Sequence, residues 1–276
     1  MIKIMVDSSS DCQQKKGAYD LLIPLTVSIG GKDYQDGLEL NADLFYELLL
    51  SNKEFPKTSQ PSPESFVNHF EKIKADGDEL LCFTLSSNLS GTYQSACIAK
   101  SMVDYDGIYI IDTLTATHMI GIMVESAAKL IGDGLSAKEI AEKCTELRSR
   151  VHVFAGLDTL EYLYKGGRLS RASATVGEIA GIKPLITVTE DGKVSAVAKA
   201  IGVPRAIQTI LNKVKSFEVD ENFPIYSLYS HGVENCKNLE DKLTAAGYAI
   251  AERRQIGSTI GAHVGPGAYA VAFVAK

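Results

Sequence analysis

Residues 80–112, "LLCFTLSSNLSGTYQSACIAKSMVDYDGIYIID", contain the pattern that decides the fold. The apolar run at 80–84 predicts a buried strand, the segment 91–103 has the spacing of a helix, and a second apolar run follows at 108–112. Strand, helix and strand in this order are typical of parallel strands that are joined by a crossover helix. Between the first strand and the helix lies a group of hydroxyl residues with one glycine, "SSNLSGT" at 86–92.

The same alternation extends through the first half of the chain. We expect further strands at 2–6 and 21–27, and further helices at 41–51, 63–74, 116–131 and 136–149. The last of these helices begins with Ser136 and Glu139 at the spacing of a capping box. Residues 1–155 are therefore predicted to form an α/β domain, with a parallel sheet and helices on both faces.

The second half of the chain has a different pattern. Asp191-Gly192 lies between two alternating runs, which predicts a hairpin whose turn needs positive φ at both positions. Around it we expect strands at 151–156, 224–229, 248–255 and 268–275, and helices near 159–165, at 171–180, after Pro204 and at 233–246. A hairpin combined with crossovers predicts that residues 156–276 form a second α/β domain with a mixed sheet.

The composition excludes several classes of protein. The 276 residues are 45% hydrophobic and 22% charged, which are globular values. A net charge of −6 and the lack of a long basic run argue against a nucleic-acid-binding surface. No apolar run approaches the roughly 18 residues of a membrane helix. The N-terminus does not resemble a signal peptide, and five cysteines without a C-x-x-C pair predict reduced thiols and no zinc site. We therefore expect a cytoplasmic protein.

Three polar groups are expected at the carboxyl ends of the first sheet's strands, where ligands bind in such folds. They are "VDSSSDC" (6–12), "KTSQPSPESF" (57–66) and the opening group at 86–92. In the second, Ser62 and Pro63 have the order of a helix N-cap and first helical position. Thr58 and Ser59 are not needed for that cap, and a ligand role is open to them.

The group at 86–92 allows three interpretations. One of its serines could cap the following helix, one could be a nucleophile, or the group could hold an anion. Gly91 would let the backbone approach a ligand, and the N–H groups of a first helical turn favour a carboxylate or phosphate. The absence of a G-x-S-x-G segment argues against the nucleophile. The choice between cap and anion site stays open on these residues alone.

A basic side chain near such a site could come from two glycine-rich segments. His263 lies in "GSTIGAHVGPGAYA" (257–270), which suits a ligand-facing imidazole better than a core histidine. Arg168 lies in "YLYKGGRLSR" (162–171), where it either follows a helix capped by Gly166 or forms a loop that meets a phosphate or a partner. Neither of the two familiar nucleotide-binding glycine motifs is present.

Seven segments in order resemble the DegV family of bacterial fatty-acid-binding proteins. They are "VDSSSD" (6–11), "IPLTV" (23–27), "KTSQPSP" (57–63), "SSNLSGTYQSA" (86–96), "LEYLYKGGRLS" (160–170), "KPLI" (183–186) and "IGAHVGPGA" (260–268). The resemblance covers nearly the whole chain. It implies two α/β domains with an acyl chain in a buried tunnel between them, no catalytic residue, and no cofactor or metal other than the bound fatty acid.

The resemblance also implies a function. Family members are similar to the binding subunit of bacterial fatty acid kinase, which holds a long-chain fatty acid while a separate ATP-binding kinase phosphorylates the carboxylate. The acyl phosphate is then carried toward phospholipid synthesis, which makes acyl-transfer enzymes further partners. The alternatives from the residues are a serine hydrolase acting on a lipid or acyl ester, with Ser90 and His263 paired, and an interaction protein whose lipid is structural.

Carried over residue by residue, the resemblance assigns the carboxylate to Thr58, Ser90 and His263. It makes Ser59, Gly91, Arg168 and Arg205 candidates for contact with the head group or a partner. Two stretches depart from the family's pattern. "LTATHMIGIMV" (114–124) replaces a glycine-rich helix start, so we expect His118 and Met119 to reshape the tunnel. After the hairpin, where the family often carries clustered basic residues, this chain has Lys199 and Arg205.

Overall fold

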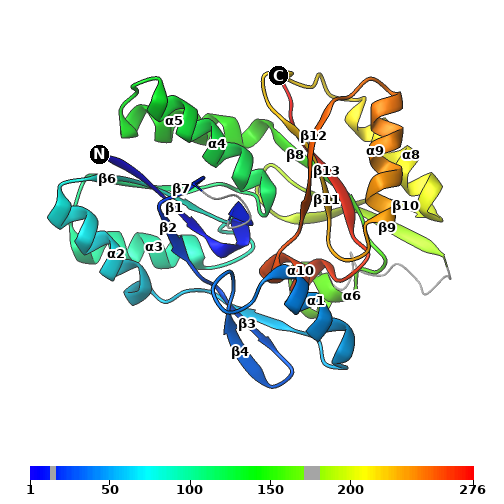
Figure 1. Ribbon diagram of the computed structural model, residues 1–276, viewed down its shortest axis with the longest axis horizontal. Coiled ribbons are helices and arrows are strands. Elements are labelled where there is room, and N and C mark those ends of the chain that lie inside the picture. Colours follow the sequence, from blue (N-terminus) through cyan, green and yellow to red (C-terminus); the bar gives the residue numbers. More distant parts are fainter. Residues whose placement is uncertain (13–16, 171–180) are drawn as a thin grey trace.

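The computed structural model describes residues 1–12, 17–170 and 181–276, which form three sheets with their covering helices (Figure 1). The helix predicted at 171–180 lies outside the described residues. In Figure 1 the two larger sheets lie on opposite sides of α4, α5 lies above the first sheet, and the third sheet lies below them.

The first sheet is parallel throughout, as predicted, with the order β2-β1-β6-β7. Its strands are β1 (Ile2–Asp7), β2 (Leu21–Ile23), β6 (Glu79–Thr84) and β7 (Ile108–Asp112). Successive side chains of a strand point to opposite faces, so Ile4 and Val6 pack into one core cluster and Met5 into another. Both faces are buried, which explains why the strands are continuous apolar runs rather than alternating ones.

Helices cover both faces of this sheet. On one face lie α2 (Pro63–Asp76) and α3 (Thr92–Val103), and on the other lie α4 (His118–Gly132) and α5 (Ala137–Leu147). The capping box of Ser136 and Glu139 is confirmed. Ser62 is the N-cap residue of α2, with Pro63 after it, but the Ser62 side chain makes no capping hydrogen bond.

The second sheet is mixed, as predicted, with the order β10-β9-β8-β13-β11-β12. Only β11 and β12 are parallel neighbours among its described strands. The strands are β8 (Val151–Gly156), β9 (Ile182–Val188), β10 (Val194–Ile201), β11 (Ile225–Tyr229), β12 (Ile250–Gln255) and β13 (Tyr269–Val274). The outer face is covered by α8 (Val203–Val214) and α9 (Glu234–Ala245).

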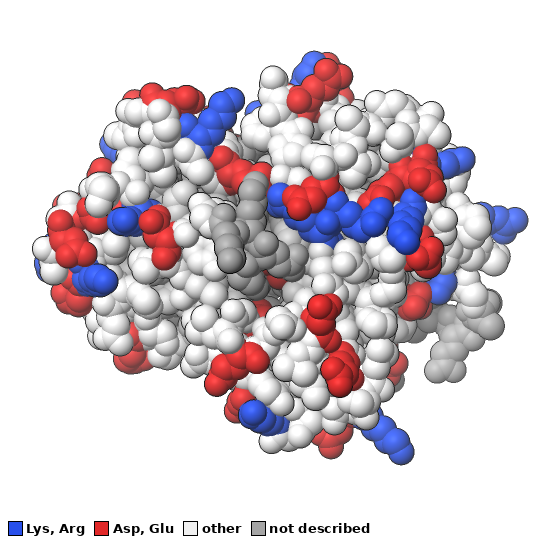
Figure 2. All heavy atoms as spheres, viewed as in Figure 1, with Lys and Arg blue, Asp and Glu red and all other residues white. Residues whose placement is uncertain are grey.

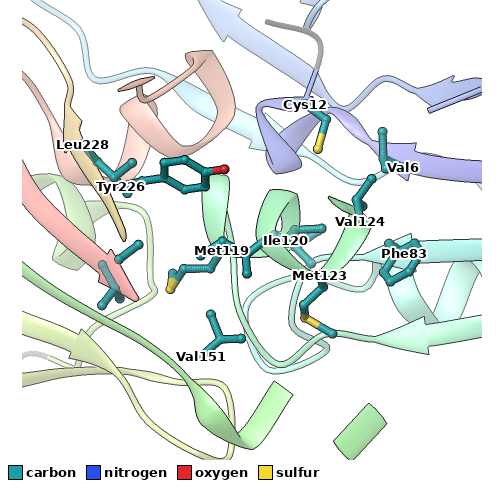
Figure 3. Packing of buried hydrophobic residues seen from close by; sticks show 14 of the residues in the cluster. Val6, Cys12, Phe83, Met119, Ile120, Met123, Val124, Val151, Tyr226 and Leu228 are labelled. Carbon is teal, nitrogen blue, oxygen red and sulfur yellow. The ribbon is translucent and has the colours of Figure 1, made fainter. Parts of the chain in front are cut away.

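Helix α4 is packed between the two large sheets. Figure 3 shows Met119, Ile120 and Met123 on this helix, with Phe83 of the first sheet on one side and Leu228 of the second on the other. These residues belong to one hydrophobic cluster that joins the two halves of the chain. The predicted domain boundary at residue 155 falls near the end of β8, which is a strand of the second sheet and ends at Gly156. The boundary itself stays a prediction.

Two predictions for the first half were wrong. The strand expected at 21–27 is two strands, because Pro24 cannot donate to a sheet ladder and the chain changes sheets there. The second of them, β3 (Thr26–Ile29), pairs antiparallel with β4 (Lys32–Gln35) and β5 (Lys57–Ser59). Thr58 therefore lies on a strand of this third sheet, and not at the end of a parallel strand.

The remaining helices lie near the third sheet in Figure 1. They are α1 (Ala42–Ser51), α6 (Glu161–Lys165) and α10 (Ser258–Val264). The glycine-rich segment around His263, which was not predicted as regular structure, forms α10. Two further short helical turns are η1 (Ser8–Ser10) and η3 (Arg148–Arg150).

The predicted hairpin is present between β9 and β10, but its turn differs from the prediction. Of Asp191 and Gly192, only Gly192 has positive φ, at 77°. The loop is one residue longer than a two-residue turn, and Gly192 N donates to Thr189 O across it. The tip reaches the loop that follows β6. Ser86 Oγ donates to Gly192 O at 2.7 Å, and Asn88 Nδ2 donates to Asp191 O at 2.7 Å.

We predict that Gly192→Ala destabilises the protein more than Gly31→Ala does. Both glycines have nearly the same φ, 77° and 76°, so each substitution incurs about 1–2 kcal/mol for a left-handed conformation. At Gly31 a new Cβ meets nothing within 4 Å, whereas at Gly192 it would overlap Ser86 Oγ and lie 3.1 Å from Leu114 Cα. Overpacking of this kind adds about 1–3 kcal/mol. Urea unfolding measures both variants, and equal losses of stability would contradict the contact between the tip and the loop.

Candidate functional site

A cavity of about 370 Å³ lies between the second sheet and the segments that follow the strands of the first sheet. This volume is within the usual range of small-molecule sites, roughly 300–1,000 Å³. Its lining is predominantly apolar and comes from both halves of the chain, including Leu25, Leu85, Leu89, Met119, Val153, Ala155, Leu163, Ile186, Val188, Val194, Leu228, Ile256, Ile260, Val264 and Ala270.

The inner face of the second sheet forms one wall of the cavity. Val153 and Ala155 of β8 point to the same side because strand side chains alternate, and Ile186 and Ala270 are the neighbours of Ala155 on β9 and β13. Ala155 and Ala270 are directly paired across the two strands. Their small side chains leave room above the sheet at this point.

Polar side chains gather around one part of the lining. Thr58 Oγ1 lies 2.8 Å from His263 Nε2, and this hydrogen bond joins β5 to α10. Ser59 and Gln60 follow Thr58 and also line the cavity, as do Ser90 and Arg168. The structure thus brings Thr58, Ser90 and His263 to the same cavity, although Thr58 and His263 are 205 residues apart.

His263 is neutral in this environment. Burial, with a smaller contribution from the Arg168 charge, lowers the pKa of His263 to about 4. Its Nδ1 is buried and has no hydrogen-bond partner among the described residues. An Nδ1–H buried without an acceptor would be costly, which favours the tautomer with the proton on Nε2. In that tautomer Nε2 donates to Thr58 Oγ1, and the Thr58 hydroxyl proton is available to a ligand.

Arg168 is a half-buried cation beside this imidazole. Its Nε donates to Leu89 O at 2.9 Å and its Nη1 to Gly166 O at 2.6 Å, so the guanidinium is fixed next to Ser90. Burial lowers the pKa of Arg168, but an arginine stays protonated at neutral pH. Gly166 is the C-cap of α6, which was one of the two interpretations of this segment, and a Cβ there would overlap the His263 ring.

Ser90 stands at the start of α3, where Gly91 is the N-cap residue. Ser90 Oγ lies 2.9 Å from Thr92 Oγ1 and also accepts from Thr92 N at 3.4 Å. Gly91 does not line the cavity. A Cβ built on Gly91 would overlap the Gln60 side chain, whose amide atoms would be the nearest to it. The bare backbone of Gly91 therefore accommodates a neighbouring glutamine.

A buried carboxylate fixes the first turn of α10. Asp36 Oδ2 accepts from Thr259 Oγ1 at 2.6 Å and from Thr259 N at 3.3 Å. Burial raises the pKa of Asp36, and the hydrogen bonds from Thr259, Ser8 and Ser258 oppose that rise. Because α10 carries His263 four residues after Thr259, Asp36 indirectly positions the imidazole.

Some predicted residues lie elsewhere. Arg205 is exposed on α8 and does not line the cavity, so any role for it is outside the polar cluster. Met119 lines the cavity, as expected for a residue that shapes it. His118, next to it, is buried on another side of α4, where its Nε2 lies 2.7 Å from Gln255 O, and burial lowers its pKa to about 4.

Among the described residues, no group of three or more His, Cys, Asp or Glu side chains could hold a metal ion. None of the helices in the described ranges is long and apolar enough to span a membrane.

Burial raises the pKa of the Cys12, Cys82, Cys144 and Cys236 thiols, so these are poor nucleophiles. Figure 2 shows acidic and basic side chains interspersed on the viewed face.

Comparison with known proteins identifies the family. A family model described as "Uncharacterised protein, DegV family" matches residues 1–276. The chain belongs to the DegV family. A DegV domain-containing protein of Caldanaerobacter subterraneus subsp. tengcongensis is 36% identical over 279 residues, which cover 100% of this chain and 99% of the relative. The resemblance inferred from the seven segments is thereby confirmed.

Solved DegV structures share the fold. A Thermus thermophilus DegV family protein, whose structure reports fatty acid binding, has a TM-score of 0.88 and 30% identity over 100% of this chain and 99% of that one. The Streptococcus pneumoniae fatty acid kinase B3 protein, solved with linoleic acid, has a TM-score of 0.88 and 23% identity over 100% of both chains. At 23% identity the second likeness concerns the fold alone. The predicted fold class, with a parallel and a mixed sheet, is confirmed.

Gln60 and the apolar wall were not predicted from the sequence. Gln60 lies in "KTSQPSP", and no sequence pattern distinguishes a glutamine that lines a cavity from one that does not. The sequence contained an indication of the wall, since alternation along 151–156 places Val153 and Ala155 on one face of the strand. It could not be inferred from the sequence that this face lines a cavity.

We predict that Arg168→Met raises the pKa of His263, because the arginine charge contributes to lowering it. The pKa should stay below the ordinary histidine value of about 6.5, because burial is the larger cause of the shift and remains. NMR titration of the His263 ring measures this directly. Lys165→Met removes an exposed cation from the same segment and should leave the titration unchanged. An unshifted titration in Arg168→Met would contradict the proximity of the two side chains.

The same titration has a consequence for stability. The folded-state pKa of about 4 lies below the unfolded value, so the unfolded chain binds this proton first as the pH falls. His263 therefore lowers the stability of the fold progressively between about pH 6.5 and pH 4, and has no such effect above that range.

Proposed function

We propose that this protein binds a long-chain fatty acid, with the acyl chain in the cavity and the carboxylate at Thr58, Ser90 and His263. The observation that carries the proposal is an apolar cavity with a group of polar residues around the Thr58–His263 hydrogen bond. An acyl chain gains free energy from leaving water, roughly 0.8 kcal/mol for each buried CH₂ group. The fatty acid reported with the Thermus thermophilus relative supports the same ligand class.

The polar end suits a carboxylate in a particular way. Thr58 and Ser90 offer neutral hydroxyl donors, and His263 is neutral as well. Arg168 is a cation that lines the cavity beside this cluster, and two of its donor atoms already bind backbone carbonyls. A carboxylate held by neutral donors keeps its charge and its nucleophilic oxygen. Ser59 lies next to Thr58 and is a further candidate for this contact.

We further propose that a separate ATP-dependent acyl kinase phosphorylates this carboxylate, and that the protein then carries the acyl phosphate toward phospholipid synthesis. Ser59 and Gln60 are exposed and also line the cavity, so the polar end is accessible from the surface. Arg168 lies where it can stabilise the charge of the acyl phosphate. On this proposal the chain is an accessory binding subunit, and catalysis belongs to the partner.

The geometry argues against a serine hydrolase. His263 Nε2 is bonded to Thr58 Oγ1, while Ser90 Oγ is bonded to Thr92 Oγ1, so serine and histidine are not paired. An imidazole with a pKa of about 4 is a weak general base at neutral pH. Its Nδ1 also lacks an orienting carboxylate among the described residues.

We predict that Thr58→Val and Ser90→Ala each weaken fatty acid binding. Loss of one hydrogen bond to a buried carboxylate costs about 1.5–3 kcal/mol, or roughly 10- to 100-fold in affinity. Mass spectrometry of denatured protein should detect a fatty acid that copurifies with the wild type, and displacement of a fluorescent fatty acid gives the affinities. Ser87→Ala is the matched control, since Ser87 is exposed on the same loop and does not line the cavity.

Two results would contradict the site assignment. The first is unchanged affinity in both Thr58→Val and Ser90→Ala. The second is an empty cavity in repeated preparations that also fail to take up added palmitic or oleic acid, which would remove the proposed function altogether.

A kinase experiment separates the carrier from a protein that holds a structural lipid. With the matching acyl kinase, ATP and radiolabelled palmitic acid, acyl phosphate should form on this protein and not on the kinase alone. Arg168→Met should reduce that yield more than it reduces palmitate binding, because the phosphate carries more charge than the carboxylate. A loaded protein that yields no acyl phosphate with the kinase would be evidence for the structural-lipid alternative.

A further inference from the structure

Gln60 occupies an unusual place in the polar cluster. It directly follows β5, it lines the cavity, and its side chain crosses the first turn of α3. Gln60 Nε2 donates to Ser95 Oγ at 3.1 Å, and Ser95 is buried one turn into the helix. At the other end of this turn, any side chain on Gly91 would overlap the Gln60 amide. The N-cap residue Gly91 and Ser95 of α3 thus accommodate one glutamine.

The Gln60 amide has donor capacity left for a ligand. A carboxamide nitrogen carries two protons, and Gln60 Nε2 makes one hydrogen bond among the described residues, to Ser95. Gln60 is two residues from Thr58 and contacts the residue after Ser90. The amide therefore lies near the segments that carry the two hydroxyls assigned to the carboxylate, beside the N-terminus of a 12-residue helix that favours negative charge.

We propose that Gln60 is a further head-group residue, which shares its amide between Ser95 and the carboxylate of the ligand and thereby makes the site select an anionic head group. The proposal rests on the proposed function, since it concerns the same polar cluster. It explains why a neutral amide stands here. A glutamate of the same size would fit the helix N-terminus but would repel a carboxylate.

The test compares Gln60→Glu with a matched control, Gln94→Glu. Gln94 is exposed in the first turn of the same helix and does not line the cavity, so the control adds the same charge to the same helix. The ligands are palmitic acid and 1-hexadecanol, which have the same chain with an anionic and a neutral head group. The chain contains no tryptophan, so affinities are measured by displacement of cis-parinaric acid.

We expect Gln60→Glu to weaken palmitate binding at least tenfold at pH 8 and to change hexadecanol binding less than twofold. The difference should shrink as the pH falls toward about 4, where the new carboxyl group becomes protonated. Gln94→Glu should bind both ligands as the wild type does. The proposal is overturned if Gln60→Glu binds palmitate normally, or if it loses both ligands equally, as a purely structural residue would.

These outcomes are distinguishable from failure of the proposed function. If the wild type binds neither ligand, the cavity does not take acyl chains, and both proposals are overturned. If Thr58→Val weakens palmitate binding but Gln60→Glu does not, the proposed function stands and only the role of Gln60 is wrong.

Discussion

Helix α4 is buried against two sheets at once, and this packing determines where the molecule can contain a cavity. Each fully buried Met, Ile or Leu side chain contributes about 1.5–3 kcal/mol, and the helix places such residues toward both sheets. The two halves of the chain are thereby held at a fixed separation. A gap remains where α4 begins, at Met119, and where the facing strands carry Ala155 and Ala270. The cavity thus forms where small side chains on the second sheet face the start of α4 and leave space unfilled.

The polar end depends on a second constraint, which is that buried polar groups need partners. Asp36 binds the first turn of α10, α10 presents His263, and His263 binds Thr58. On the other side, Arg168 is fixed by the carbonyl of Leu89, next to Ser90. The five segments that meet here, around residues 36, 58, 89, 168 and 263, come from distant parts of the sequence. Their hydrogen bonds preorganise the hydroxyls before any ligand arrives, which lowers the entropic cost of binding.

Much of this arrangement could be predicted from sequence, and the failures have physical causes. The parallel strands were predictable because burial on both faces produces continuous apolar runs, as at 80–84 and 108–112. The helix at 137–147 was predictable from its capping box. The third sheet was not predicted, although Gly30-Gly31 between two short runs is a hairpin signal. Helix α10 was also not predicted, because its segment is rich in glycine, which has a low helix propensity. Its helical form depends on tertiary contacts such as that of Asp36 with Thr259. Candidate residues could be named, but their meeting at one cavity could not be inferred without the fold.

The pairing of Ala155 with Ala270 has a consequence for how such proteins can diverge. These two residues line the cavity from β8 and β13, whereas the polar end is built by β5, α10 and the loops before α3 and after α6. A larger side chain at either alanine would shorten the space for an acyl chain without touching Thr58, Ser90 or His263. If the cavity holds fatty acids as proposed, chain-length preference can therefore change by single mutations while the head-group chemistry is retained. A genome that encodes several such carriers could divide a mixed pool of lipids among them by this route.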